Sequence, residues 1–304
     1  MFILEWLEVA VSWILVSFHS LLSPILGAES GITWALSIVG LVIVIRIALI
    51  PLFVKQIKAQ RGMQLLQPDM TEIQQKYAGD RNKQSEEMMK LYRETGTNPL
   101  SSCLPLILQA PIFYALFQVL QGIATNDAKG VFTWESVAGT SGQALFEQAR
   151  SALLFGHVPL YGTFKDADQT PFPTWTRVAC GILVVLMTLT TFTTQRQLMV
   201  KNMPAGNPLA QQQKILLYVF PLMFAVGGFG FPVGVLIYWL TTNLWSMGQQ
   251  FWVIRNNPTP GTPAYDAHEA RKAEKQAAKV QAQAAKNPDF AAQLEAEQAA
   301  AGSR

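Results

Sequence analysis

A single charge inside an apolar stretch sets the strongest limit on what this chain can fold into. Residues 31–54, GITWALSIVGLVIVIRIALIPLFV, are long enough to cross a bilayer, which takes about 20 apolar residues. Arg46 is the charged residue of this stretch, and isoleucine flanks it on both sides. An arginine cannot lose its proton in proteins, and placing it at the bilayer centre costs about 2.5–3.5 kcal/mol. Arg46 therefore either reaches a membrane interface or faces a polar cavity inside a helix bundle.

The distance to the next charge favours the cavity. Eight residues separate Arg46 from Lys55, which corresponds to about 12 Å along a helix. An arginine side chain does not comfortably span that gap. We therefore expect residues 31–54 to form a first membrane span whose arginine lines a polar cavity.

The rest of the chain predicts an all-α polytopic membrane protein. Half of the residues are hydrophobic, only 14% are charged, and long apolar runs alternate with polar blocks. We expect a core of five transmembrane helices, formed by residues 31–54, 98–121, 173–196, 215–231 and 232–254. The connecting segments are a helical hairpin at 55–97, an exported loop at 122–172, a cytoplasmic loop at 197–214 and a flexible cytoplasmic tail at 255–304.

The distribution of Lys and Arg predicts which segments are cytoplasmic. The block from Lys55 to Asn98 holds eight basic residues, whereas residues 122–172 hold three. Short cytoplasmic loops carry an excess of Lys and Arg, so the hairpin and the C-terminus are expected on the cytoplasmic side.

Residues 1–27 have two interpretations. Their polar residues recur at helical spacing and form one stripe, which is typical of an amphipathic helix lying in the membrane interface. A complete additional span is the alternative. The first basic residue of the chain is Arg46, so the positively charged start of a cleaved signal peptide is not present.

The hairpin at 55–97 carries candidate contacts for partner proteins. Two amphipathic patterns flank the turn Ala78-Gly79-Asp80, and Pro68 either kinks the first helix or starts a new one. Methionines are adaptable contact residues, but here they can equally form the seam between the two helices. The candidate contact residues are Lys58, Arg61, Met70, Met88 and Met89.

Polar residues in the predicted spans could line the cavity around Arg46. Tyr238, Thr242, Trp245 and Gln249 follow each other at i, i+4, i+7 and i+11, on one helix face. The alternative is structural, because threonine hydroxyls bond back to their own helix and amides bond between helices. The further candidates are Gln109, Thr188, Thr191, Thr241 and Asn243.

The sequence gives no sign of an enzyme. The predicted spans contain no Asp or Glu, and the three histidines lie in different segments. A nucleotide-binding P-loop pattern is absent as well. We therefore expect no catalytic residues, no metal site, no cofactor and no direct nucleic-acid function.

Three stretches give the chain a resemblance to the YidC/Oxa/Alb family of membrane protein insertases, most of all to its actinobacterial members. They are LQPDMTEIQQKYAGDRNKQSEEMMKLYRETGTNP after the arginine span, CLPLILQAPIFYALFQVL, and FPVGVLIYWLTTNLWSMGQQ. The resemblance covers about residues 30–255. It implies a five-helix core with a hydrophilic groove open to the cytoplasm and to lipid. Arg46 then corresponds to the groove arginine, and Tyr238 with Trp239 to the substrate-contacting face of the last span.

The resemblance also implies a function. Such a protein inserts and chaperones membrane proteins in the bacterial plasma membrane without hydrolysing nucleotides. Its substrates are nascent membrane proteins, and the SecYEG translocon and the ribosome are candidate partners besides the lipid bilayer. Two alternatives follow from the residues alone. One is a secondary transporter or channel with Arg46 as an anion site, and the other is a passive scaffold in which Arg46 is structural.

Overall fold

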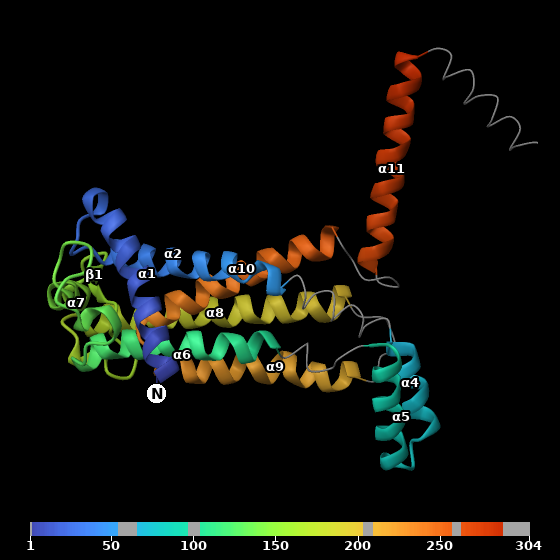
Figure 1. Ribbon diagram of the computed structural model, residues 1–304, viewed down its shortest axis with the longest axis horizontal. Helices are drawn as coiled ribbons and strands as arrows, with labels where there is room; N and C mark the ends of the chain where they lie inside the picture. The colour runs from blue at the N-terminus through green and yellow to red at the C-terminus, as the bar shows by residue number, and fades with distance from the viewer. Residues whose placement is uncertain (1, 54–65, 97–103, 203–208, 257–262, 288–304) are drawn as a thin grey trace, which may run out of the picture.

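The computed structural model of the protein describes residues 2–53, 66–96, 104–202, 209–256 and 263–287, and the part of the chain that it describes is mostly helical. The helices α2, α6, α8, α9 and α10 run along the long axis of the molecule (Figure 1). α8 packs against α9 and α10, and α10 also packs against α2 and α6. The bounds of these helices are Gly31–Ala48 for α2, Leu104–Thr125 for α6, Pro173–Asn202 for α8, Leu209–Gly228 for α9 and Val233–Asn256 for α10.

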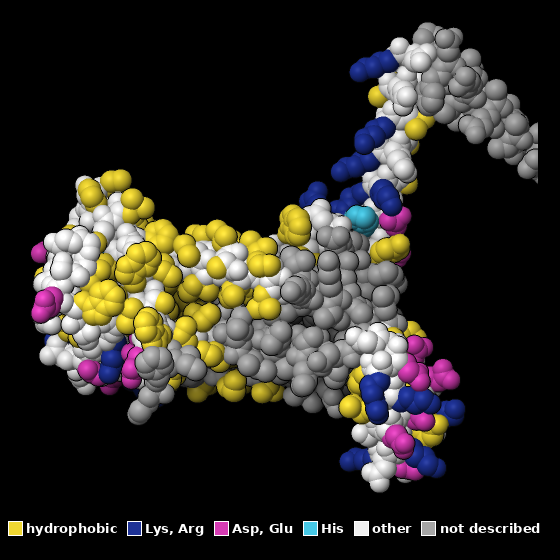
Figure 2. Space-filling view, viewed as in Figure 1, with side chains coloured by type: hydrophobic (Ala, Val, Ile, Leu, Met, Phe, Trp, Pro, Cys, Tyr) yellow, Lys and Arg dark blue, Asp and Glu magenta, His cyan; other side chains and the backbone are white. Residues whose placement is uncertain are grey.

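The bundle has the surface of a membrane protein. Apolar side chains cover the described part of the bundle on the face seen in Figure 2, whereas Lys, Arg, Asp and Glu gather at its two ends. Among the described residues, three helical stretches are long and apolar enough to cross a membrane by length and composition. They are Leu4–Leu26, Gly31–Ala48 and Pro173–Arg196.

Several helix ends differ from the predicted bounds. α2 ends at Ala48, where Leu49 adopts φ −89° and ψ −1°, and residues 50–53 form a further helical turn. The expected cytoplasmic loop at 197–214 is wrong in its extent, since α8 continues to Asn202 and α9 already begins at Leu209. Apolar periodicity marks only the part of a helix that is in contact with lipid or core, so it misses helical turns that continue into polar sequence.

The N-terminal helix α1 (Phe2–Leu26) packs against α2 and α6 at one end of the bundle. In Figure 1 it runs steeply across the direction of the bundle helices, not along it. Its side chains Val11, Leu15 and Val16 are buried, whereas Trp6 and Trp13 are exposed. Its composition would allow a span, but its direction resembles that of a helix lying on the interface.

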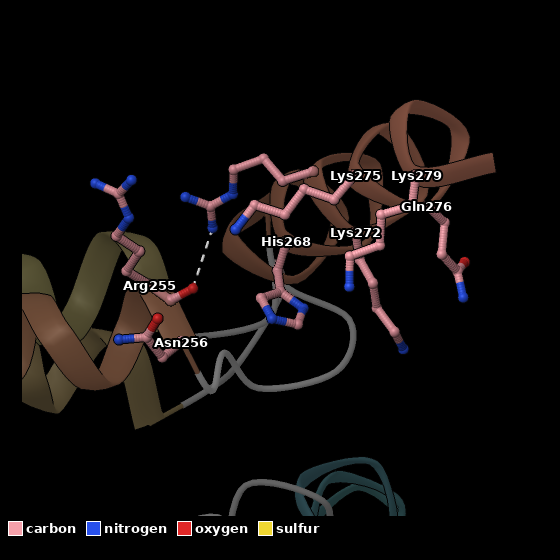
Figure 3. A pocket seen from close by; sticks show the side chains of 8 residues that line it. Arg255, Asn256, His268, Lys272, Lys275, Gln276 and Lys279 are labelled. Carbon is pink, nitrogen blue, oxygen red and sulfur yellow. Dashed lines mark hydrogen bonds between the residues drawn. The ribbon is translucent and has the colours of Figure 1, made fainter. Parts of the chain in front are cut away.

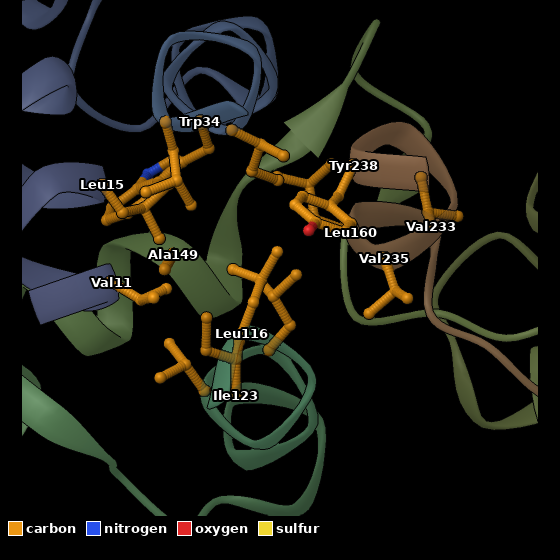
Figure 4. Close-up of a cluster of buried hydrophobic side chains, with 14 of the residues drawn as sticks. Val11, Leu15, Trp34, Leu116, Ile123, Ala149, Leu160, Val233, Val235 and Tyr238 are labelled. Carbon is orange, nitrogen blue, oxygen red and sulfur yellow. The ribbon is translucent and has the colours of Figure 1, made fainter. Parts of the chain in front are cut away.

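Residues 122–172 form a folded cap, which the expectation of a loop did not capture. The cap contains α7 (Gly142–Ser151), the antiparallel pair β1 (Leu153–Leu154) and β2 (Val158–Pro159), and the short 3-10 helices η2 (Gly130–Thr133) and η3 (Ala167–Gln169). Ala149 and Leu160 of the cap meet Leu15, Trp34 and Ile123 in one buried apolar cluster (Figure 4). The elements of the cap are short. Even the amphipathic helix α7, which buries Leu145, Phe146 and Ala149, has only 10 residues, and this is too little periodic sequence to identify a helix.

The opposite end of the bundle carries α4 (Gln67–Lys76), α5 (Arg81–Glu94) and α11 (Pro263–Lys286). α4 and α5 pack together as the predicted hairpin, and Pro68 lies in the first turn of α4, so it starts a helix. The carboxylate of Asp80 caps α5 by accepting hydrogen bonds from the backbone amides of Asn82 and Lys83, both at 3.1 Å. In the expected flexible tail, residues 263–286 are helical.

Candidate functional site

Arg46 lies in the last turn of α2, and its side chain is buried between helices with only 7% of its surface exposed. Its Nη2 atom donates a hydrogen bond to the backbone carbonyl of Thr242 on α10, over 3.4 Å. Its guanidinium carbon lies 5.3 Å from the centre of the Phe53 ring, which is within the range of a cation–π contact. The arginine is therefore directed into the bundle and away from lipid.

Tyr238 forms the second part of the site. Its side chain is only 3% exposed, and its hydroxyl accepts a hydrogen bond from Nε2 of Gln109 on α6. The hydroxyl is also close enough to Arg46 for the two groups to interact electrostatically. Thr242 Oγ1 is buried near Tyr238 without an aligned hydrogen bond among the described residues. Arg46, Gln109, Tyr238 and Thr242 thus form one polar cluster, contributed by α2, α6 and α10.

The charge of this cluster is not neutralised within the described part of the chain. None of the ion pairs found there includes Arg46. The predicted spans themselves contain no Asp or Glu. A buried cation normally needs a counter-charge and several hydrogen-bond acceptors. The cluster is therefore suited to receive water or an acidic group from outside.

The threonines of α8 form a separate group with a structural role. Asn243 Nδ2 on α10 donates hydrogen bonds to Thr191 Oγ1 at 2.8 Å and to the carbonyl of Met187 at 3.3 Å. Thr188 Oγ1 donates to the carbonyl of Val184 in its own helix, and Thr241 Oγ1 to that of Ile237. The hydrogen bonds of these four predicted site residues hold α8 against α10 or return to their own helix, and none joins them to Arg46.

Trp239 and Trp245 also lie outside the Arg46 cluster. Trp239 packs among aromatic rings of α6 and α9, 5.1 Å from the centre of Phe113 and 4.4 Å from that of Phe224. Trp245 Nε1 donates to Gln249 Oε1 over 3.2 Å, and its ring lines an apolar pocket of about 490 Å³. The stripe that the sequence places on one face of α10 is therefore divided between a buried polar end at Tyr238 and an apolar groove at Trp245.

The three methionines of the hairpin differ in burial. Met70 is buried in the seam between α4 and α5, where the hydroxyl of Tyr92 lies 3.9 Å from its sulfur. Met89 is 51% exposed, and Met88 is half-buried. Burial raises the pKa of Tyr92 above its usual value. The other two predicted contact residues, Lys58 and Arg61, lie outside the described residues.

Sequence reasoning missed the aromatic surroundings of the site. Phe53 comes seven residues after Arg46, a spacing that returns to the same helix face. That periodicity could have revealed the contact. Phe113 of α6 and Phe231, in the turn between α9 and α10, pack with Trp239 and Phe117. They gave no comparable signal, because each is an aromatic residue within a mainly apolar stretch.

Comparison with known proteins identifies the family. The family model described as "60Kd inner membrane protein" matches residues 25–260. The chain belongs to this family. A membrane protein insertase YidC of Streptomyces avermitilis is 54% identical over 270 residues, covering 86% of this chain and 61% of that protein. A YidC of Tropheryma whipplei strain Twist is 40% identical over 276 residues, covering 86% of both chains.

The fold agrees with this family. A crystal structure of an active YidC insertase with its first transmembrane domain resolved matches with a TM-score of 0.50 and 22% identity. The match covers 82% of this chain and 47% of that one. The protein is thus a mostly helical, multi-pass member of the YidC insertase family, as its sequence resemblance predicts. The match to a Streptomyces protein also fits the expected actinobacterial relationship. Family membership favours the insertase over the transporter and channel alternatives.

Proposed function

We propose that the protein inserts membrane proteins by receiving a polar segment of the substrate at the Arg46 cluster. Carrying polar backbone or charge through hydrocarbon is costly, and a polar site partway across the membrane shortens that barrier. The observation that carries the proposal is the buried guanidinium of Arg46, which has one backbone acceptor at 3.4 Å and forms no ion pair with the described residues. An acidic residue of the passing segment supplies the missing counter-charge.

The proposed topology has five transmembrane helices, α2, α6, α8, α9 and α10, with α1 lying on the outer interface. The hairpin α4–α5 and the C-terminus are cytoplasmic, and the cap of residues 122–172 is exported. The charge distribution supports this orientation, since eight basic residues fall between Lys55 and Asn98 and three within the cap. The direction of α1 across the bundle supports its interfacial position (Figure 1).

The proposed partners follow from this topology. Nascent membrane proteins are the substrates, and they leave the site laterally into the bilayer. The exposed side chain of Met89 and the charged surface of the hairpin are available to the ribosome or the SecYEG translocon. Methionine side chains adapt to varied apolar surfaces, which suits contacts with several partners.

The test of the proposal is insertion into proteoliposomes by variants of Arg46. The substrates are two versions of a single-span protein, one with an acidic exported tail and one with the same tail neutralised. Arg46→Lys keeps the charge and is expected to retain most of the insertion of both substrates. Arg46→Glu is expected to lower insertion of the acidic substrate at least tenfold, because opposite charges about 4 Å apart are worth about 4 kcal/mol in a partly screened site. The neutral substrate is expected to change much less.

Two results would oppose the electrostatic account. One is equal insertion of the acidic substrate by Arg46→Lys and Arg46→Glu. The other is an Arg46→Ala variant that loses thermal stability and inserts both substrates equally poorly, which is the behaviour of a structural arginine. Photocrosslinkers at Gln109 and Thr242 provide an independent check, with the outward-facing Val226 on α9 as the control position. Crosslinks to the nascent chain from the first two positions and not from the third are expected.

A further inference from the structure

The basic residues of α11 are concentrated on one face of the helix. At 100° per residue, Arg271, Lys272, Lys275, Lys279 and Lys286 fall within an arc of about 100°. The acidic residues Asp266, Glu269 and Glu274 lie outside this arc. The helix is therefore a cationic strip, although its net charge is small.

The strip is directed toward the membrane-embedded part of the molecule. In Figure 1, α11 leaves the end of the bundle at a steep angle to the bundle helices, so it runs along the plane of the membrane surface. In Figure 2, its Lys and Arg side chains project toward the side on which the apolar surface of the bundle lies. A basic helix in this orientation presents its charges to the headgroup layer and not to bulk solvent.

A pocket of about 430 Å³ lies between this strip and the end of α10 (Figure 3). Its position is fixed in part by Arg271, whose Nη2 donates a hydrogen bond to the backbone carbonyl of Arg255 over 3.1 Å. Glu269 forms ion pairs at the edge of the strip, 3.7 Å from Lys272. The pocket is lined by Arg255, Asn256, His268, Arg271, Lys272, Lys275, Gln276 and Lys279.

An apolar groove lies on the same face of α10, one turn before this pocket. It measures about 490 Å³, and Trp252 and Val253 line the end of it nearest to Arg255. By helical geometry, Trp252 and Asn256 are one turn apart on a common face. Ile50, from the turn after α2, forms another part of the groove wall. An apolar groove that leads to a cationic pocket matches a molecule with an acyl chain and an anionic headgroup.

We propose that an anionic phospholipid binds here, with its phosphate among the cations of α11 and Arg255 and an acyl chain along the groove at Trp252. The lipid fixes α11 on the membrane surface beside the end of α10. Each basic residue near an anionic membrane surface raises the binding affinity about fivefold. The attraction is screened by salt over about 8–10 Å at physiological ionic strength. This inference does not depend on the substrate site at Arg46.

The experiment compares amide hydrogen exchange of residues 263–286 in the full-length protein in nanodiscs of two compositions. One contains phosphatidylcholine alone, and the other also contains phosphatidylglycerol. Phosphatidylglycerol is expected to slow exchange in α11 at least tenfold, and high salt is expected to remove the effect. The variant Lys272→Gln/Lys275→Gln/Lys279→Gln is expected to exchange at one rate in both compositions. A matched control, Lys83→Gln/Lys90→Gln/Arg93→Gln on α5, is expected to keep the protection.

A second measurement tests the groove. Native mass spectrometry of the full-length protein is expected to find retained phosphatidylglycerol, and Trp252→Ala is expected to lower the retained amount several-fold. Three results would overturn the proposal. They are equal exchange of the unmodified protein in both nanodiscs, equal protection by inorganic phosphate in phosphatidylcholine nanodiscs, and loss of ribosome binding in the triple-lysine variant with unchanged lipid protection. The last result would show that the basic residues of α11 bind ribosomal RNA and not lipid.

Discussion

Asn243 on α10 donates a hydrogen bond to the hydroxyl of Thr191 on α8, with 2.8 Å between Nδ2 and Oγ1. The same amide reaches the carbonyl of Met187, one turn earlier on α8. This hydrogen bond shows that Thr191 and Asn243 pack α8 against α10. From the sequence alone, both residues were candidates to line the cavity around Arg46. Polar residues inside a membrane protein therefore have to be assigned one at a time.

Replacing Asn243 by alanine is expected to reduce stability by about 1 kcal/mol. Hydrogen bonds between membrane helices average about 0.6 kcal/mol and reach about 1.7, and here one amide makes several. Thermal unfolding in detergent measures the change. Thr241→Ala is the control, because the hydroxyl of Thr241 bonds to its own helix at Ile237, 2.8 Å away. An equal loss in both variants would contradict the role of Asn243 in joining α8 to α10.

The ring of Tyr238 is expected to stabilise the fold by packing, and its hydroxyl is expected to hold the polar cluster together by hydrogen bonding. Tyr238→Phe keeps the packing against Phe113, 6.0 Å between ring centres, and leaves the Gln109 amide without its acceptor. The expected stability loss is about 1 kcal/mol. Tyr238→Ala also loses a buried ring, and the expected loss rises to about 3–5 kcal/mol. Chemical denaturation in mixed micelles measures the free energy of unfolding of the two variants. Similar losses in Tyr238→Phe and Tyr238→Ala would show that the hydroxyl, not the ring, makes most of the contribution of Tyr238 to stability.

Gly130 is expected to be essential for holding the cap against α1. Its φ is +60°, and a Cβ atom there would collide with Ser12 Oγ and lie 2.6 Å from the carbonyl oxygen of Glu8. Ser12 Oγ also accepts a hydrogen bond from the amide of Val131 over 2.9 Å. Gly130→Ala is therefore expected to cost about 1–3 kcal/mol for overpacking, besides about 1–2 for the left-handed backbone.

The control for this substitution is Gly139→Ala. Gly139 has φ +83°, and a Cβ atom there would meet nothing within 4 Å. The Gly139→Ala variant therefore has the cost of the left-handed backbone but no steric collision. The difference in protease sensitivity between the two variants then reports the contact between α1 and the cap. Limited proteolysis of the cap gives a direct measurement. Equal protease sensitivity of the two variants would show that the contact contributes nothing.

The hairpin is expected to loosen at alkaline pH because of Tyr92. Burial raises the pKa of Tyr92, so the folded hairpin holds the phenol proton more tightly than the unfolded one. The stability associated with the neutral phenol is complete below the usual tyrosine pKa of about 10 and is lost as pH rises through the higher folded value. Amide exchange of residues 81–94 against pH measures this loss. Tyr92→Phe should remove the part of the pH dependence that comes from this group, and an unchanged profile would argue against it.

The sequence by itself determined the membrane class, the family, the bundle helices and the turn of the hairpin. Apolar length and helical periodicity are local properties, and they are sufficient to place the first residues of α2, α8 and α10 to within one position. The sequence alone also predicted that the Arg46 side chain faces the inside of the bundle, because a charge exposed to lipid is costly in any arrangement of the helices. The C-terminal ends of helices were harder to predict. α2 ends at Ala48 within apolar sequence, whereas α8 continues from its apolar part into polar sequence up to Asn202.

Only the tertiary structure decided which polar residues belong together. Gln109 and Tyr238 are 129 residues apart and meet through the packing of α6 against α10, whereas Thr191 and Asn243 meet on another side of α10. Spacing along one helix fixes a face, but the neighbour that this face contacts depends on how all the helices are arranged. The folded cap and the membrane-directed strip of α11 depend on contacts and directions in space for the same reason.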